Sequence, residues 1–545
     1  MAPSTLSHIF PTSGTLKPRR AITIPQHDVH ISHSRLQILV EEFGSQLGSL
    51  GIKKGDVVSL CLTNGLGFVL AFLATGGIRA VSAPLNPHYT QAEVEFYLQD
   101  TQTSILILPV LESLNETDRK GAEQALSAAK KLHVKVAVLK LAEKTCSPKL
   151  KIIFESYKAQ KESAGQAKLF AQVDGNSKEA QEDDVALVLH TSGTTGKPKA
   201  VPLTHLNLLT TVRNIIRTYK LSPSDTGYLV MPLFHVHGLM CGLLSALYSG
   251  GGVVIPARFS PTTFWPDFTK EKCSWYTAVP TIHSILLSAP LPSPIPNIRF
   301  IRSCSSSLSP TVFHNLEKTF KAPVLEAYAM TEAAHQMTSN PLPEDGQRRP
   351  GCVGRGQGVE VTIRLDDGKE VKTGEVGEVC IRGKNVTNGY VNNPKANREN
   401  FFADGWFRTG DQGKLDKDGY LSLTGRLKEL INRGGEKISP LEIDSAILSL
   451  EGVGEAVCFG VPNEKYGEIV WAAVVPKSGA KLSVPQIQKD LGPKIAKYKI
   501  PERVFIVKSI PKTATGKIQR RHVSTAFVEK AKKEDSEKGT RESKL

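Results

Sequence analysis

Nine consecutive residues have the composition of a loop that binds phosphate groups: Thr191-Ser192-Gly193-Thr194-Thr195-Gly196-Lys197-Pro198-Lys199. Their hydroxyl groups can donate hydrogen bonds to phosphate oxygens, the glycines let the backbone approach a ligand, and the lysines add positive charge. The loop differs from a Walker motif, because two residues separate its glycines and Pro198 follows Lys197. Since it follows the apolar run Val185–Leu189, we predict a phosphate site at a strand end. The alternative is an ordinary flexible loop.

Four more segments, all C-terminal to this loop, combine charged residues with glycines or hydroxyls: Tyr328–Glu332, Gly405–Asp411, Gly425–Lys437 and Pro511–Ile518. With the loop, they resemble the ordered motifs of the adenylate-forming superfamily, which includes acyl-CoA synthetases, luciferases and the adenylation domains of peptide synthetases. The resemblance covers residues 30 to 525, and Ala329 stands where the superfamily usually has glycine.

The resemblance implies a role for residues of each motif. Thr331 would hold an α-phosphate oxygen, Glu332 would bind Mg²⁺ through a carboxylate oxygen, and Asp411 would accept bonds from the ribose hydroxyls. Arg426 would reach the ribose or phosphate, and Lys517 would bridge the acid and the α-phosphate. Taken singly, Asp411 could be a turn residue and Lys517 a solvated loop lysine. The residues expected to bind the nucleotide are Thr191, Ser192, Gly193, Thr194, Thr195, Gly196, Lys197, Lys199, Glu326, Ala327, Tyr328, Asp411 and Arg426.

The resemblance also implies a reaction in two steps with ATP, Mg²⁺ and CoA. A carboxylate attacks ATP to give an acyl-adenylate and pyrophosphate, and a thiol then displaces AMP to give a thioester. Between the steps a small C-terminal domain would rotate about the hinge residue Lys428, which moves Lys517 away and brings Gly434 and Gly435 to the CoA channel. The chain end contains no phosphopantetheine-attachment sequence, which favours free CoA.

The segments expected to choose the acid are unusually polar. His235, Ser305 and His335 are the residues that we expect to bind it, and His235 also matches a family position that gates the carboxylate and thiol paths. Such residues would leave buried polar groups unpaired against an alkyl chain, at a cost of roughly 1–3 kcal/mol each. They suit a very short acid with a second carboxylate. The alternative is that one or two of these histidines are structural.

Five segments resemble the oxalate–CoA ligases of fungi and plants, a subgroup that also has alanine at position 329: Phe234–Gly238, Trp275–His283, Arg302–Ser305, Leu325–Glu332 and Glu429–Lys437. This resemblance predicts oxalate as the acid. A medium-chain fatty-acyl or 4-coumarate-type ligase is the alternative in the same family.

Alternating strand and helix signals must position these residues. Between Val185 and Tyr328, short apolar runs such as Tyr228–Met231 and Trp275–Val279 are typical of strands covered on both faces. Ser260 and Ser309, each followed by proline, are typical helix starts. The N-terminal residues follow the same pattern, with a helix near Ser34–Leu47. We therefore predict an α/β fold with two mainly parallel sheets in stacked α/β layers.

After about residue 350, strands separated by turns predict a β-barrel-like subdomain. A compact α+β segment begins after Arg426, where Ser439-Pro440-Leu441-Glu442 has the pattern of a capping box. We predict an N-terminal adenylation domain over residues 1–427 and a small mobile domain over residues 428–545. Residues Lys158–Asp184 are expected to form a surface insertion or linker.

The composition is that of a soluble globular protein, and its charge leaves a second class of ligand open. Of 545 residues, 40% are hydrophobic and 22% charged, which excludes a mostly disordered chain. A net charge of +15 suits nucleotide ligands, or weak RNA association, although no RNA-recognition module is present. The eight cysteines show no zinc or disulfide pattern and are expected to be reduced, and no segment suggests a membrane span.

The chain ends in Ser543-Lys544-Leu545, which has the form of the tripeptide that a peroxisomal import receptor reads. The alternative is a chance ending. Residues Lys530–Leu545 are highly charged and free of aromatics, so we expect a flexible tail. The predicted location is the peroxisomal matrix, or the cytosol as well.

Overall fold

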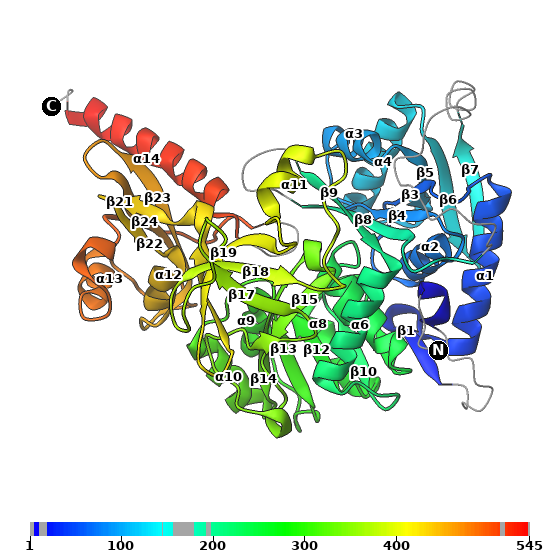
Figure 1. Cartoon of the computed structure of the whole chain (residues 1–545), viewed down its shortest axis with the longest axis horizontal. Helices are drawn as coiled ribbons and strands as arrows, with labels where there is room; N and C mark the ends of the chain where they lie inside the picture. Colours follow the sequence, from blue (N-terminus) through cyan, green and yellow to red (C-terminus); the bar gives the residue numbers. More distant parts are fainter. Residues whose placement is uncertain are drawn as a thin grey trace.

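The computed structural model describes residues 5–9, 19–143, 145–155, 179–191, 198–512 and 518–542. They form a large α/β body with two sheets, a small antiparallel sheet and a C-terminal α+β domain. In Figure 1 the C-terminal domain, coloured orange to red, lies at one end of the molecule, next to the yellow antiparallel sheet. None of the helices in these ranges is long and apolar enough to cross a membrane.

The first sheet of the body has seven strands in the order β7-β6-β5-β3-β4-β8-β9. Their bounds are β3 (Val57–Leu60), β4 (Val81–Pro84), β5 (Thr103–Pro109), β6 (Lys135–Leu141), β7 (Pro148–Phe154), β8 (Val185–Thr191) and β9 (Lys199–Thr204). The edge strands β7 and β9 are antiparallel, and the others are parallel. The accompanying helices are α1 (His33–Ser49), α2 (Leu66–Gly77), α3 (Gln91–Asp100) and α4 (Glu116–Lys131). The parallel sheet and the helix near residues 34–47 are confirmed.

The second sheet has nine strands in the order β16-β15-β14-β13-β12-β10-β11-β1-β2. Its parallel centre contains β10 (Thr226–Leu229), β11 (Gly252–Val254), β12 (Trp275–Ala278), β13 (Phe300–Ser303) and β14 (Val324–Met330). The antiparallel strands β15 (His335–Ser339) and β16 (Arg355–Gly356) close one side. Because β10, β12, β13 and β14 are parallel, the residues that follow them gather at one edge of the sheet.

Helices cover this second sheet and begin largely where the sequence indicates. They are α6 (His205–Tyr219), the π-helix η4 (His237–Leu244), α7 (Ser245–Tyr248), α8 (Pro261–Lys270), α9 (Pro280–Ser288) and α10 (Pro310–Phe320). The Ser309 hydroxyl accepts from the Val312 N–H, as an N-cap does. Ser260 also precedes its helix, but its hydroxyl contacts Thr262 instead of capping the backbone.

The first two strands of the chain join the second sheet, not the first. β1 (Arg20–Ile24) is parallel to β11, and β2 (Val29–Ser32) is antiparallel to β1 at the sheet edge. The Ile255 N–H donates to the Thr23 carbonyl at 2.8 Å. One apolar core, with Phe72 from the first sheet's helices and Leu209 and Leu244 from the second's, then fills the space between the layers.

The segment expected to be barrel-like is a four-stranded antiparallel sheet with β17 and β20 at its edges. Its strands are β17 (Glu360–Arg364), β18 (Gly377–Arg382), β19 (Phe407–Leu415) and β20 (Leu421–Arg426), and α11 (Pro394–Asn400) precedes β19. Asp411 on β19 is the direct cross-strand partner of Arg426 on β20. The sheet therefore places a carboxylate and a guanidinium side by side.

The C-terminal domain contains a five-stranded sheet in the order β22-β21-β24-β23, with β25 paired to β24. Its elements are β21 (Ile431–Arg433), β22 (Glu436–Ile438), β23 (Val453–Asn463), β24 (Gly467–Pro476), β25 (Arg503–Ile506), α12 (Pro440–Leu448), α13 (Val484–Leu491) and α14 (Arg520–Glu542). A single 3₁₀ turn, η7 (Leu427–Glu429), joins it to β20. The predicted domain boundary and the predicted hinge residue Lys428 both lie in this turn.

Two local predictions for the C-terminal part are wrong in detail. The Ser439 hydroxyl caps α12 by accepting from the Glu442 N–H, but the Glu442 carboxylate pairs with Lys499 at 2.7 Å instead of returning to the cap. The expected flexible tail is helical as far as Glu542. Phe527 and Ala531 pack into the domain core, and Ala, Lys and Glu favour helix, so charge alone was a poor guide.

The prediction that residues 158–184 form a surface insertion or linker is wrong at the C-terminal end of that segment. Asp184 is fully buried and forms a bidentate ion pair with Arg79, at 2.7 and 2.9 Å. Residues 158–178 lie outside the described ranges. All eight cysteines are free, and all but Cys352 are buried, which agrees with reduced core thiols.

Candidate functional site

The predicted phosphate loop joins two antiparallel strands, and its two flanks are described. Thr191 ends β8 and pairs with Lys199, the first residue of β9. The residues between them, Ser192 to Lys197, lie outside the described ranges. The Lys199 ammonium lies 4.5 Å from the centre of the Tyr390 ring. Partial burial lowers the pKa of Lys199, and the charge of Glu332 opposes that shift.

Glu332 stands in η5 (Thr331–Ala333), directly after β14, and is 6% exposed. The Tyr390 hydroxyl donates to its Oε1 at 2.9 Å. Burial raises the pKa of Glu332, whereas that hydrogen bond and the positive charges of Lys199 and Arg426 act in the opposite direction. A carboxylate oxygen held in this way is the hard ligand that Mg²⁺ prefers, and phosphate oxygens and water would complete its shell.

Asp411 receives two neighbouring donors on its carboxylate. Arg426 Nε lies 3.2 Å from Oδ1, and the Tyr328 hydroxyl donates to Oδ2. Burial, followed by the Asp411 charge, raises the pKa of Tyr328, so the phenol remains a donor. Since a carboxylate can accept about four hydrogen bonds, Asp411 retains capacity for a diol. The structure therefore brings these three predicted residues together.

Glu326 and Ala327 lie on β14, before the motif that holds Glu332. A carboxyl oxygen of Glu326 accepts from the Gly351 N–H at 2.8 Å, so the side chain holds a loop of the body in place. Burial raises the pKa of Glu326 to about 8, although hydrogen bonds from Gly351 and Leu308 oppose that shift. Any contact between Glu326 and a nucleotide stays a prediction.

Glu326→Gln is expected to flatten the pH dependence of stability. The folded carboxyl keeps its proton up to about pH 8, whereas the unfolded one loses it near pH 4.3. Between these values the folded state binds more protons, so wild-type stability falls with rising pH, by at most about 1.4 kcal/mol per unit. Urea unfolding at pH 5, 6, 7 and 8 measures how the free energy of unfolding changes with pH in the wild type and in the variant. Equal slopes for wild type and variant would contradict the buried-carboxyl assignment.

Ser305 and His335 meet around a third residue, His237. The His237 ring stacks on His335, with ring centres 5.1 Å apart. Its Nδ1 lies 3.1 Å from the Ser305 hydroxyl oxygen. His235 lies beside this group, and its Nδ1 accepts from the His237 backbone N–H at 3.1 Å. The predicted binding role of His235 stays a prediction, and His237 is the histidine whose ring joins the other two residues.

The backbone is unusual at the same place. Ser305 has a φ of 74° and His335 a φ of 114°, in the region that favours glycine. Such conformations cost about 1–3 kcal/mol each and tend to occur at functional sites, where the surrounding structure holds them. His237 also begins the π-helix η4, another feature that is common at functional sites.

Two polar residues behind this group were missed as site candidates. Thr277 on β12 and Arg302 on β13 are both buried, and the Arg302 side chain is fully buried. Thr277 Oγ1 lies 2.6 Å from His237 Nε2. The available signal was their position: each is a polar residue near the carboxyl end of an otherwise apolar strand, where parallel sheets place ligands.

The hinge region contains the predicted CoA-channel glycines in a tight turn. Gly434 and Gly435 are the two residues between β21 and β22, with φ values of 60° and 92°. A two-residue hairpin turn of this kind needs positive φ at both positions, which by itself explains glycine there. A role in the CoA channel stays a prediction, as does rotation about Lys428.

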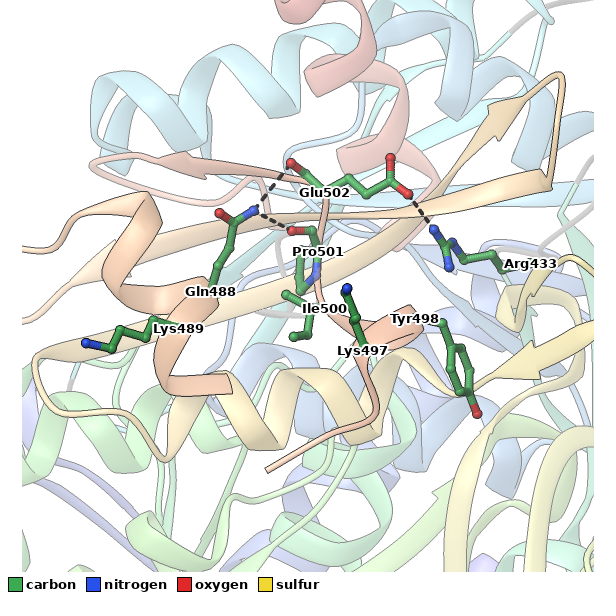
Figure 2. Close-up of a pocket in the computed structure, with 8 residues that line it drawn as sticks. All are labelled: Arg433, Gln488, Lys489, Lys497, Tyr498, Ile500, Pro501 and Glu502. Atoms are coloured by element: carbon green, nitrogen blue, oxygen red, sulfur yellow. Dashed lines mark hydrogen bonds and ion pairs between the residues drawn. The ribbon is translucent and has the colours of Figure 1, made fainter. Parts of the chain in front are cut away.

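A groove of about 690 Å³ lies next to this turn in the C-terminal domain. Figure 2 shows its lining: Arg433, Gln488, Lys489, Lys497, Tyr498, Ile500, Pro501 and Glu502. Arg433 pairs with Glu502 at 2.7 Å, and the Gln488 amide donates to the Pro501 carbonyl at 2.9 Å. Among the described residues, none of those predicted to bind nucleotide or acid lines it. Lys517 lies outside the described ranges.

Comparisons with protein families match most of the chain. Residues 12–391 match the AMP-binding enzyme family, and residues 442–517 match the AMP-binding enzyme C-terminal domain. The first match contains the Thr191–Lys199 loop and Glu332, and the second ends at Lys517. Asp411, Arg426 and Lys428 lie between the two matches.

Individual relatives match at full length. The chain is 48% identical over 519 residues to an oxalate–CoA ligase of Arabidopsis thaliana, with 94% of this chain and 96% of that protein covered. It is 44% identical over 547 residues to an oxalate–CoA ligase of Saccharomyces cerevisiae, covering 97% and 98%. Among solved structures, ATP-bound MatB from Rhodopseudomonas palustris matches with a TM-score of 0.82 at 28% identity, covering 96% and 99%.

Proposed function

As the chain belongs to the AMP-binding enzyme family, we propose that it is an ATP-dependent ligase that joins oxalate to CoA and releases AMP and pyrophosphate. The observation that carries the choice of acid is the polar cluster of His237, Ser305 and His335 at the carboxyl edge of the second sheet. The naming of two full-length relatives as oxalate–CoA ligases supports it. An alkyl or hydroxycinnamoyl group would offer the Ser305 hydroxyl proton no acceptor, at a cost of roughly 1–3 kcal/mol.

In the first half-reaction an oxygen of one oxalate carboxylate attacks the α-phosphorus of ATP, and the bond to pyrophosphate breaks. Asp411 would hold the ribose, Glu332 would hold Mg²⁺, and the Thr191–Lys199 loop would hold the β- and γ-phosphates. Mg²⁺ supplies positive charge against the phosphate oxygens. Thr331 and Lys517 would stabilise the charge at the α-phosphate and the attacking carboxylate, where a preorganised donor is most effective.

In the second half-reaction the CoA sulfur attacks the acyl carbon of the adenylate. The bond from that carbon to the AMP oxygen breaks, and the thiol proton leaves to solvent or a base. Before this step the C-terminal domain would turn about Lys428, so that Lys517 leaves and Gly434 and Gly435 approach the pantetheine arm. His235 would gate the paths of carboxylate and thiol.

A panel of acids tests the proposed substrate. Purified enzyme with ATP, Mg²⁺ and CoA is assayed for AMP with oxalate, malonate, acetate, octanoate and 4-coumarate. We expect the highest kcat/KM for oxalate. A clear preference for octanoate or 4-coumarate would reject oxalate and support the alternative acids of the same family.

For the cellular location, we propose import into the peroxisomal matrix through Ser543-Lys544-Leu545, which lie outside the described ranges. A fluorescent protein fused to the N-terminus should be peroxisomal with the full chain and cytosolic when these three residues are deleted. Unchanged location after deletion would reject the receptor-read signal. Weak RNA association stays a prediction of the +15 charge alone.

A further inference from the structure

A continuous series of buried polar side chains lies behind Ser305. Arg302 donates from Nε to the Tyr219 hydroxyl at 2.7 Å and from Nη1 to Thr277 Oγ1 at 3.2 Å. Thr277 Oγ1 lies 2.6 Å from His237 Nε2, and His237 Nδ1 lies 3.1 Å from Ser305 Oγ. The series thus connects a guanidinium in the core to a hydroxyl at the edge of the site.

The Arg302 guanidinium has neutral acceptors around it. Its remaining hydrogen-bond partners are Gln336 Oε1 at 3.3 Å and His237 Nε2 at 3.4 Å. Among the described residues, no carboxylate forms an ion pair with it. A buried charge normally has a counter-charge, so the positive charge of Arg302 is available to an anion bound nearby.

The chemistry of each group fixes the direction of the hydrogen bonds. A guanidinium can only donate, so Thr277 Oγ1 accepts from Arg302 and can donate its own proton to His237 Nε2. Since Nε2 then accepts, the neutral imidazole carries its proton on Nδ1 and donates it to Ser305 Oγ. The Ser305 hydroxyl proton remains for a further acceptor, and Ser305 is the partly exposed member of the series.

We propose that Arg302 is a positioning residue for acid recognition: through Thr277 and His237 it directs the Ser305 hydroxyl proton to the carboxylate of the acid that does not react. This inference rests on the proposed function, because it assumes that a short diacid lies against Ser305. The positive φ of Ser305 agrees with it, since a strained backbone there keeps the hydroxyl at the site.

Two variants, each lacking one hydroxyl partner of Arg302, test the series of hydrogen bonds from Arg302 to Ser305. Thr277→Val removes the hydroxyl that links Arg302 to His237 and leaves only their longer direct contact of 3.4 Å. Tyr219→Phe removes a partner of Arg302 that does not lead to Ser305. We expect Thr277→Val to raise KM for the acid roughly 10- to 100-fold. This is the effect of losing the hydrogen bond from Ser305 to the charged carboxylate of the acid. KM for ATP and kcat should stay within about threefold, and Tyr219→Phe should leave the acid KM near the wild-type value. Similar acid KM values for both variants would overturn the proposal.

A second pair of variants tests whether the side chain at position 302 must be one that can only donate hydrogen bonds. Arg302→Lys keeps a cation that can only donate, but Arg302→Gln offers an acceptor that can turn the Thr277 hydroxyl away from His237. The lysine variant should keep a lower acid KM than the glutamine variant; the reverse order would count against the proposal. If neither folds, the Thr277 and Tyr219 variants decide. All assays use whichever short diacid wild type prefers, oxalate or malonate, so rejection of oxalate in favour of malonate affects the proposed function and not this test.

Discussion

Replacing Glu332 by glutamine is expected to lower kcat/KM for ATP roughly 100- to 1,000-fold, because a neutral amide binds Mg²⁺ far more weakly than a carboxylate. The substitution is nearly isosteric, and the glutamine oxygen can still accept from the Tyr390 hydroxyl that now donates to Glu332 at 2.9 Å. The buried position should therefore remain folded. Pyrophosphate–ATP exchange measured over a range of Mg²⁺ concentrations should show a higher half-saturating concentration in the variant.

Tyr390→Phe is the matched control for this prediction. It removes the hydrogen bond to Glu332 but retains the carboxylate and the ring beneath Lys199. Loss of one hydrogen bond to a carboxylate can lower activity roughly 10- to 100-fold, but the Mg²⁺ dependence should stay that of wild type because the carboxylate remains. An Mg²⁺ dependence of Glu332→Gln equal to that of wild type would contradict the assignment of Glu332 to the metal.

Lys517→Ala should separate the two half-reactions. The terminal-motif resemblance assigns Lys517 to the charge that develops between the carboxylate and the α-phosphate, so pyrophosphate–ATP exchange should fall roughly 100- to 1,000-fold. Thioester formation from preformed oxalyl-adenylate and CoA should stay within about threefold, because that step lacks the charge that Lys517 would stabilise. Rapid-quench measurement of each half-reaction provides the comparison.

Lys512→Ala gives a control in the same motif. Lys512 pairs with Glu455 at 2.8 Å on the surface of the C-terminal domain, and such pairs contribute about 1 kcal/mol or less. Both half-reactions should survive in this variant. A parallel loss of both half-reactions in Lys517→Ala would assign that residue a structural role instead.

The strands of the body could be predicted because their apolar runs are short and lie between strong turn signals. The strand Trp275–Ala278 agrees with the predicted run Trp275–Val279, because strands covered on both faces are mostly apolar in sequence. The prediction of a flexible tail was wrong because the segment was considered apart from the helix that it continues. Lys530–Glu542 looks solvated in isolation, and it forms a helix because it continues α14, which Phe527 and Ala531 anchor to the domain.

The sequence predicts which types of residue form the site. It does not predict which of these residues contact one another. His235 was the predicted site residue, but the ring that faces Ser305 belongs to His237, which begins the π-helix. Arg302 and Thr277 pair across neighbouring strands, a register that the sequence does not show. Asp411 and Arg426 likewise meet because β19 and β20 are antiparallel partners.

The position of β1 and β2 affects how the body can fold. Residues 20–32 complete a sheet whose other strands come from residues 226–356, while the other sheet is built from residues 57–204. The first layer is thus inserted in the chain between two parts of the second, so the second layer cannot be cut out as a contiguous fragment. Shortening the chain past β2 would leave β11 as a bare edge strand, open to pairing with other molecules. The second layer is therefore complete only when chain segments from both sides of the first layer are present.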